Sequence, residues 1–201
     1  MKKTMLLLGA LMLSAAAGYA QESRQDASIS ATVPFAPQVT GNSVQENMSM
    51  TIGLLASYRY LLTPRSGLEV NYSYAQNTHY YQVFGQAQGG IHTLQQEISA
   101  AYVFGLNFKR YNPFLEAGPG AMIFSPFKDA GTTNLDVKQQ TIIGGLFGGG
   151  VAYELSPSFD IRAGYRGFVG KTPDFDKTGN VFKTNRYQLI STPSIGIAYH
   201  F

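Results

Sequence analysis

Residues 193–201 read PSIGIAYHF and alternate between two classes of side chain. The large apolar and aromatic residues share one parity: Ile195, Ile197, Tyr199 and Phe201. The small or polar residues share the other: Ser194, Gly196, Ala198 and His200. Because side chains of a strand alternate between its two faces, the stretch predicts a strand with one apolar face and one small, polar face. The rest of the chain decides whether that apolar face meets a protein core or lipid.

The first twenty residues, MKKTMLLLGALMLSAAAGYA, combine two lysines, an apolar run and a small-residue ending. This three-part layout predicts a secretory signal peptide over residues 1–20. An N-terminal anchor helix is the alternative, but the apolar run is shorter than the ~20 residues that a spanning helix needs. We therefore expect one exported domain over residues 21–201.

The composition is that of a chain that meets a nonpolar solvent. Charged residues make up only 13% of it, about half the usual share, and aromatic residues make up another 13%. The net charge is +3, of which Lys2 and Lys3 supply two, so a nucleic-acid partner is not expected. The sequence has no cysteine, which excludes disulfides and thiolate metal sites.

The alternating pattern recurs in eight segments, each long enough for a tilted membrane crossing of about 9–11 residues. They are residues 26–36, 48–62, 67–76, 93–106, 112–124, 139–155, 158–171 and 185–201. Short connections alternate with longer polar ones around 37–47, 77–92, 125–138 and 172–184. After residue 20 no apolar run reaches the length of a membrane helix. The predicted fold class is all-β, an eight-stranded antiparallel up-and-down transmembrane β-barrel, with a soluble barrel or sandwich as the alternative.

Eight aromatic residues on the apolar parity lie beside the short turns or the chain end. They are expected to form a girdle at one membrane interface. The girdle residues are Tyr58, Tyr60, Tyr102, Phe104, Tyr153, Phe159, Tyr199 and Phe201.

Charged residues on the small, polar parity are expected to point into the lumen, mostly in its periplasmic half. They are Arg59, Glu69, Glu116, Glu154, Asp160, Arg162 and Arg166. An eight-stranded barrel is just wide enough for side chains to fill it, and buried charges must be paired. We expect a network that plugs the lumen, with Arg162 paired to Glu69, Glu116 or Asp160. A gated ion path through the same residues is the alternative.

The alternating final strand with a terminal Phe resembles the C-terminal signature of bacterial outer-membrane proteins, and the chain after residue 20 resembles the OmpA/OmpX-like eight-stranded barrels. The resemblance implies residence in the bacterial outer membrane among its lipids and lipopolysaccharide. It implies that the barrel-assembly machinery reads Ile195, Ile197, Tyr199 and Phe201 during insertion. No peptidoglycan-binding domain is expected.

No catalytic or metal site is predicted. His79 and His92 fall in one predicted loop without a metal-ligand spacing, and no Ser–His–acid arrangement can be placed. Neither a cofactor nor a metal is expected. The expected role is structural or adhesion-like, with a ligand at the loops 77–92 and 172–184 and with Tyr80, Tyr81 and Phe84 as contacts. A narrow pore or small-solute transporter is the alternative, and a lipid-modifying enzyme is a weaker one.

Overall fold

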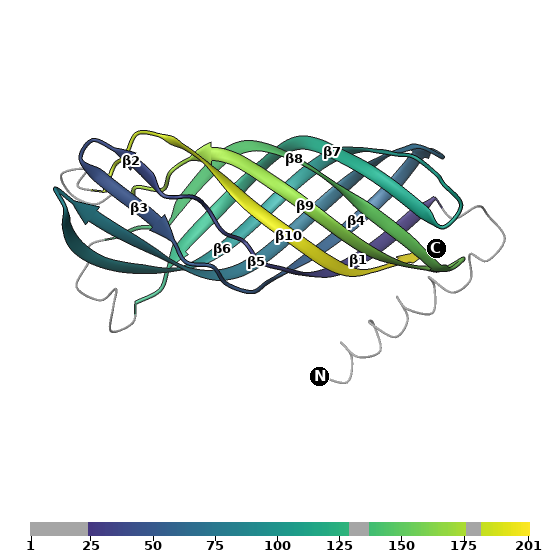
Figure 1. Ribbon diagram of the computed structural model, residues 1–201, viewed down its shortest axis with the longest axis horizontal. Helices are drawn as coiled ribbons and strands as arrows, with labels where there is room; N and C mark the ends of the chain where they lie inside the picture. Colours follow the sequence, from purple (N-terminus) through teal and green to yellow (C-terminus); the bar gives the residue numbers. More distant parts are fainter. Residues whose placement is uncertain (1–23, 129–136, 176–181) are drawn as a thin grey trace, which may run out of the picture.

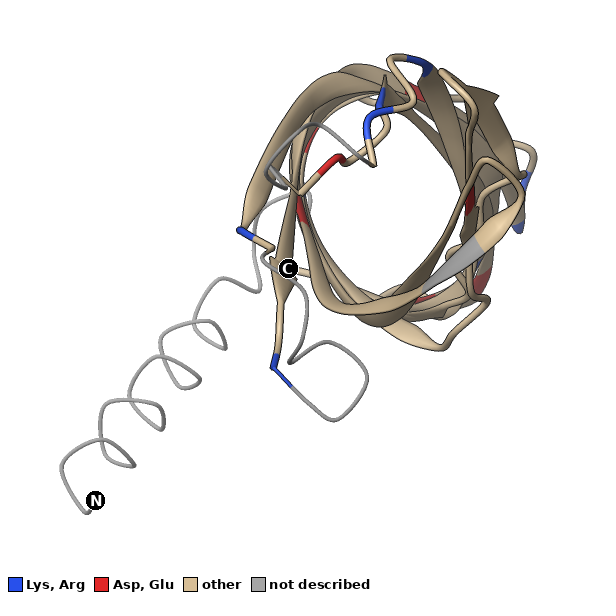
Figure 2. Cartoon of the chain, turned by 90° about the vertical axis from the view of Figure 1, so that its left-hand side faces the viewer, with Lys and Arg blue, Asp and Glu red and all other residues tan. Residues whose placement is uncertain are grey.

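Backbone pairing closes this chain into a ring of eight antiparallel strands (Figures 1 and 2). The computed structural model describes residues 24–128, 137–175 and 182–201, so the signal peptide predicted at 1–20 lies outside the described residues. The ring contains β1 (Gln25–Thr32), β4 (Gly53–Thr63), β5 (Ser66–Val83), β6 (Gln86–Gly105), β7 (Tyr111–Pro126), β8 (Gln140–Ser156), β9 (Phe159–Lys171) and β10 (Tyr187–His200). The predicted eight-stranded up-and-down barrel is confirmed.

The final strand closes the ring. Ile197 of β10 lies opposite Ile29 of β1 on one side and Ile161 of β9 on the other. The hydrogen bonding continues to the last residue, because the backbone N–H of Phe201 donates to the carbonyl of Gln25 at 3.0 Å. Following the resemblance to outer-membrane barrels, we call the end with the short turns and Phe201 the periplasmic end and the opposite end the extracellular end.

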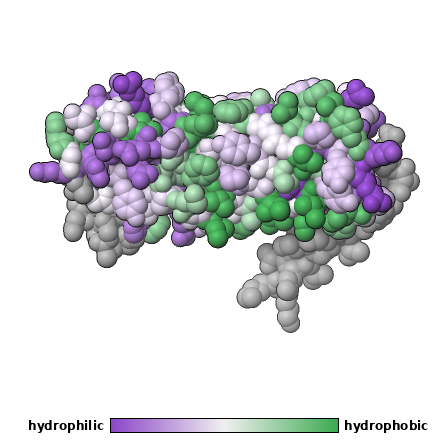
Figure 3. Space-filling view, in the orientation of Figure 1, coloured by the Kyte–Doolittle hydropathy of each residue, from purple (hydrophilic) through white to green (hydrophobic). Residues whose placement is uncertain are grey.

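The outward parity of the strands carries the apolar residues that lipid requires. Leu54, Ile98, Leu115 and Ile197 are all exposed, and apolar residues gather along the middle of the barrel surface (Figure 3). Hydrophilic residues gather at the two ends instead (Figure 3). Among the described residues, no helix is long and apolar enough to cross a membrane.

The extracellular end extends beyond the ring as two hairpins, so two of the loops predicted from the sequence are wrong. Residues 37–47 contain β2 (Val39–Gly41) and most of β3 (Val44–Met48), and β3 pairs with the far end of β5. Residues 77–92 continue β5 and β6 as one long hairpin. The alternation of inward and outward side chains persists there, and β3 supplies the second hydrogen-bonding partner for β5. In the extension, β5 is therefore paired on both edges, with β3 on one side and β6 on the other.

Inward-facing glycines make room for large interior side chains. A Cβ at Gly144 would lie 2.2 Å from the carbonyl oxygen of Val169 and 2.7 Å from the Phe168 ring. A Cβ at Gly150 would lie 2.9 Å from the Phe114 ring. These glycines therefore leave the space that atoms of the Phe168 and Phe114 rings occupy.

Gly144 and its neighbour Gly145 provide a matched test of this packing. Gly144→Ala should destabilise the barrel by about 1–3 kcal/mol, because its methyl group has no free space. Gly145→Ala should be neutral or slightly stabilising, because no atom lies within 4 Å of its Cβ. Urea titration of the barrel refolded in lipid vesicles measures both changes. Equal effects at the two positions would contradict the inward placement of Gly144.

Leu54 tests whether the outward face meets lipid. Leu54→Arg should lower the free energy of unfolding in bilayers by about 2–4 kcal/mol, because an Arg near the membrane centre is costly. Thr40→Arg is the control, since Thr40 is exposed on β2 in the extension. The folded fraction is read from heat-modifiable gel mobility, and a Leu54 variant that folds like the Thr40 variant would show that this face does not contact lipid.

Candidate functional site

The periplasmic half of the lumen contains three arginines held by carboxylates. Arg59 donates to Glu69 at 2.7 Å and lies over the Phe114 ring, 5.0 Å from its centroid. Arg162 donates to Asp26 at 2.8 Å. All these charged side chains are buried, so each pair also satisfies groups that would otherwise be desolvated without compensation.

Arg166 joins three strands across the lumen. Its guanidinium lies 3.2 Å from Glu97 of β6 and 3.2 Å from Glu116 of β7, and it also donates to the hydroxyl of Ser99. Nearer the periplasmic mouth, Asp160 lies 2.8 Å from the imidazole of His200. The network thus ties most of the ring together from within.

The predicted network needs three corrections. Arg162 pairs with Asp26, not with Glu69, Glu116 or Asp160, because those three carboxylates are held by Arg59, Arg166 and His200. Glu154 is only half-buried at the rim, and no ion pair forms between it and another described residue. Sequence reasoning also missed two members, Asp26 and Glu97.

The sequence pattern around both missed carboxylates indicates that they face the lumen. Asp26 alternates with Ala27 and Ile29, and Glu97 alternates with Ile98 and Ala100, so both fall on the polar parity. Parity alone would have placed them in the lumen. It could not have assigned partners, because pairing depends on how the strands are staggered around the ring.

The predicted girdle residues lie on the outward face at the periplasmic end. Ring centroids are 6.4 Å apart for Tyr58 and Phe201, 6.0 Å for Tyr199 and Phe201, and 5.0 Å for Phe159 and Tyr199. Tyr153 contacts Tyr111, which the sequence prediction left out. The membrane-interface role of these residues, and the reading of the last strand by the assembly machinery, stay predictions.

The extracellular half of the lumen is filled by an apolar cluster that we call the plug. It is built from Ala36, Val44, Met48, Tyr81, Ile91, Met122, Phe124, Ile142, Phe168, Phe175, Phe182 and Ile190. The β2–β3 hairpin supplies Val44 and Met48, and the connection after β9 supplies Phe175 and Phe182. The lumen is therefore lined by ion pairs in its periplasmic half and filled mainly by apolar side chains in its extracellular half, where the buried Glu46–His79 pair is an exception.

Tyr81 and His79 lie inside the plug, contrary to their predicted loop positions. Tyr81 stacks on Phe182 with centroids 4.6 Å apart, and its hydroxyl donates to the carbonyl of Pro173 at 2.7 Å. Burial, together with the nearby Glu46 carboxylate, raises the pKa of Tyr81 well above its ordinary value, so the phenol stays protonated. His79 lies 2.9 Å from Glu46 and packs edge-on against Phe124 and Phe175. This pair fastens β3 to β5 inside the plug.

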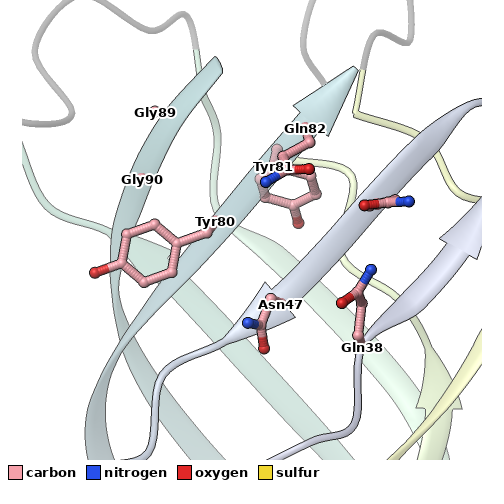
Figure 4. A pocket seen from close by; sticks show the side chains of 8 residues that line it. Gln38, Asn47, Tyr80, Tyr81, Gln82, Gly89 and Gly90 are labelled. Atoms are coloured by element: carbon pink, nitrogen blue, oxygen red, sulfur yellow. The ribbon is translucent and has the colours of Figure 1, made fainter. Parts of the chain in front are cut away.

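The outer face of the two hairpins holds a cavity of about 380 Å³ (Figure 4). We call this surface the hairpin face, and it is lined by Gln38, Gln45, Asn47, Tyr80, Tyr81, Gln82, Gly89 and Gly90. Its exposed side chains are uncharged amides and the ring of Tyr80, which is half-exposed. Both hairpins contribute, so only the tertiary structure creates it.

The Arg162–Asp26 pair can be tested by a double-mutant cycle. Arg162→Ala should cost roughly 3–5 kcal/mol of stability, because it leaves Asp26 buried and unpaired. Adding Asp26→Ala should restore part of that loss, whereas adding Glu69→Ala should give a further loss, since Glu69 is held by Arg59. Urea titration in vesicles measures all variants, and additive losses for Arg162 and Asp26 would show that they do not interact.

Solved structures with the same fold are similar to about nine-tenths of the chain. Neisserial surface protein A matches with a TM-score of 0.62 at 19% identity, covering 89% of this chain and 98% of its own. OprG from Pseudomonas aeruginosa matches with a TM-score of 0.63 at 12% identity, covering 90% and 97%. Ail of Yersinia pestis matches with a TM-score of 0.52 at 16% identity, covering 90% and 100%. At these identities the likeness establishes the fold alone.

Among curated proteins, none matches this sequence. The sequence model of the outer membrane protein beta-barrel domain matches residues 4–201. That range contains every described strand, the charged lumen and the plug. The chain belongs to the outer membrane protein beta-barrel domain family and is a small β-barrel of the bacterial outer membrane.

Proposed function

We propose that this barrel is a surface-interaction protein with a closed lumen, which binds an uncharged saccharide at its hairpin face. The position of Phe84, at the tip of the β5–β6 hairpin, carries the proposal. Two further features support it: the filled lumen, and the uncharged lining of the cavity beside the hairpin.

Phe84 is exposed at a backbone position that does not suit it. Its side chain is 83% exposed and its φ is 50°, followed by Gly85 with a φ of 77°. Two-residue hairpin turns with positive φ favour Asn-Gly or Asp-Gly, and a bulky residue there costs on the order of 1–3 kcal/mol. A large apolar side chain at that position gains little from the fold. Contact with a partner is the role that the strain and the exposure favour.

The chemistry of the hairpin face matches a neutral saccharide. An exposed tyrosine ring offers an apolar surface with a polar tip, and amide side chains both donate and accept hydrogen bonds. Gln38 and Asn47 supply such amides in the cavity that Tyr80 also lines (Figure 4), and Gln45 is a third amide in the lining. No charged side chain lines the cavity within the described residues, so an anionic ligand would have no counter-charge there.

The interior supports a closed barrel. The plug buries Tyr81, Phe124, Phe175 and Phe182 to an exposure of 1% or less. Below it, one lumen cavity measures about 30 Å³, room for about one or two waters. A further cavity of about 170 Å³ opens at the periplasmic mouth, where it is lined by Asp26, Arg59 and Arg162 among others.

A narrow pore remains the alternative function, and the vestibule at the periplasmic mouth is the feature that favours it. Planar-bilayer recordings distinguish the two, because we expect no steady conductance from the unmodified barrel.

We also propose that the protein is not an enzyme. His79 is fully buried in the plug, and His200 is held by Asp160, so neither is placed to act on a lipid at the outer surface.

Phe84→Asn separates binding from folding. Asn tolerates positive φ, so the variant should fold at least as well as the parent and gain up to about 1 kcal/mol of stability. Binding should fall on the order of tenfold or more, because the exposed ring is lost. The measurement uses cells that display the barrel, applied to arrays of neutral, sialylated and sulfated oligosaccharides. Tyr80→Ala is the companion variant inside the cavity, and Thr40→Ala, exposed on β2 outside the cavity lining, is the control.

Retention of binding in both Phe84→Asn and Tyr80→Ala would exclude the hairpin face. Binding of sulfated but not neutral saccharides would contradict the uncharged ligand. Failure to bind any arrayed saccharide, with the barrel folded and displayed, would contradict the saccharide assignment.

A further inference from the structure

A second extracellular cavity, separate from the hairpin face, is lined by cations. It measures about 360 Å³ and lies where the extracellular ends of β8, β9 and β10 meet. Lys171 ends β9, and Lys183 and Arg186 precede β10. All three side chains are exposed, and within the described part of the chain no ion pair forms between any of them and a carboxylate.

Neighbouring segments fix the backbone that carries these cations. The side-chain amide of Asn42, in the β2–β3 turn, donates to the carbonyl of Lys183 at 3.2 Å. The backbone N–H of Thr172 donates to the carbonyl of Arg186 at 3.0 Å, and the hydroxyls of Thr172 and Thr184 bond to each other. These hydrogen bonds fix the backbone that carries the cations, and a fixed backbone lowers the entropy cost of binding an anion.

One carboxylate lines the cavity, and it is already engaged. The side-chain amide of Gln140 donates to Asp174 at 2.9 Å, while the Gln140 carbonyl oxygen accepts the backbone N–H of Asp174 at 2.7 Å. Three cations against one carboxylate leave an excess of two positive charges among the described lining residues. That excess matches a phosphate group.

The lower wall of the cavity belongs to the lipid-facing surface. Ile143 is 82% exposed and Tyr187 is 68% exposed, and both line the cavity. Tyr187 lies opposite Lys171 in the β9–β10 ladder, and Val169, two residues before Lys171, faces outward. The cavity thus joins an apolar wall to a cationic rim, the arrangement that an amphiphile with an anionic head requires.

We propose that this cavity binds a phosphate group of lipopolysaccharide in the outer leaflet. The three cations contact the phosphate on the glucosamine head, and an acyl chain lies along Ile143 and Tyr187. A free anion would use the cations but gain nothing from the apolar wall. The site is independent of the saccharide proposed for the hairpin face, since the two cavities share no lining residue.

The test compares a triple variant with a matched control. Lys171→Gln, Lys183→Gln and Arg186→Gln together remove the cations of the site. Arg65→Gln, Lys109→Gln and Arg110→Gln together remove three exposed cations at the periplasmic end. The whole barrel, purified in detergent, is titrated with phosphorylated lipid A, dephosphorylated lipid A and inorganic phosphate, and bound lipid is counted by native mass spectrometry.

The parent and the control should bind phosphorylated lipid A alike, and the dephosphorylated form more weakly. The site variant should lose about fivefold in affinity per cation, on the order of 100-fold in all. Lys171→Arg with Lys183→Arg should retain binding, which separates loss of charge from loss of fold. Heat-modifiable mobility checks that each variant is folded.

Three results would overturn the proposal. One is equal affinity of the parent for the two forms of lipid A, and another is an equal loss in the control variant. The third is complete displacement of lipid A by millimolar inorganic phosphate, which would identify a site for soluble anions instead. None of these results depends on whether the hairpin face binds saccharide.

Discussion

Lipid offers the peptide backbone no hydrogen-bond partner, so each strand of this protein must be paired on both edges where it crosses the membrane. The pairing of β10 with β1 meets that requirement, because it turns a sheet with two free edges into a ring. The last strand pairs with β1 on one edge and with β9 on the other. Ile197, for example, lies opposite Ile29 of β1 and Ile161 of β9. The outward apolar face and the inward polar face both follow from that closure.

Closing a ring of eight strands creates an interior that side chains must fill. This barrel fills it in two ways, with ion pairs in the periplasmic half and the plug in the extracellular half. The inward glycines are part of the same solution, since Phe114 and Phe168 lie where a Cβ would stand. The proposed closed lumen would assign the protein's contacts with other molecules to its outer surfaces.

The plug also determines those outer surfaces. Val44 of the β2–β3 hairpin and Phe175 and Phe182 of the segment after β9 pack into the plug, which holds both segments against the end of the barrel. The Glu46–His79 pair and the Tyr81 hydroxyl hold the same segments with directed bonds. The hairpin face and the cationic cavity therefore lie on a fixed support, and both involve the β2–β3 hairpin.

Alternation of residue types determined the strand count, the direction of each face and the inward position of Arg59, Glu69, Glu116, Asp160, Arg162 and Arg166. A period of two is a local property of the chain, so it can be read without the fold. The partner of Arg162 could not be read, because Asp26 is 136 residues away in sequence and reaches it only once β1 closes on β10. The burial of His79 and Tyr81 was missed for the same reason. Their polar neighbours resemble a loop, and only the pairing of β3 with β5, with Phe175 and Phe182 above, makes that stretch an interior.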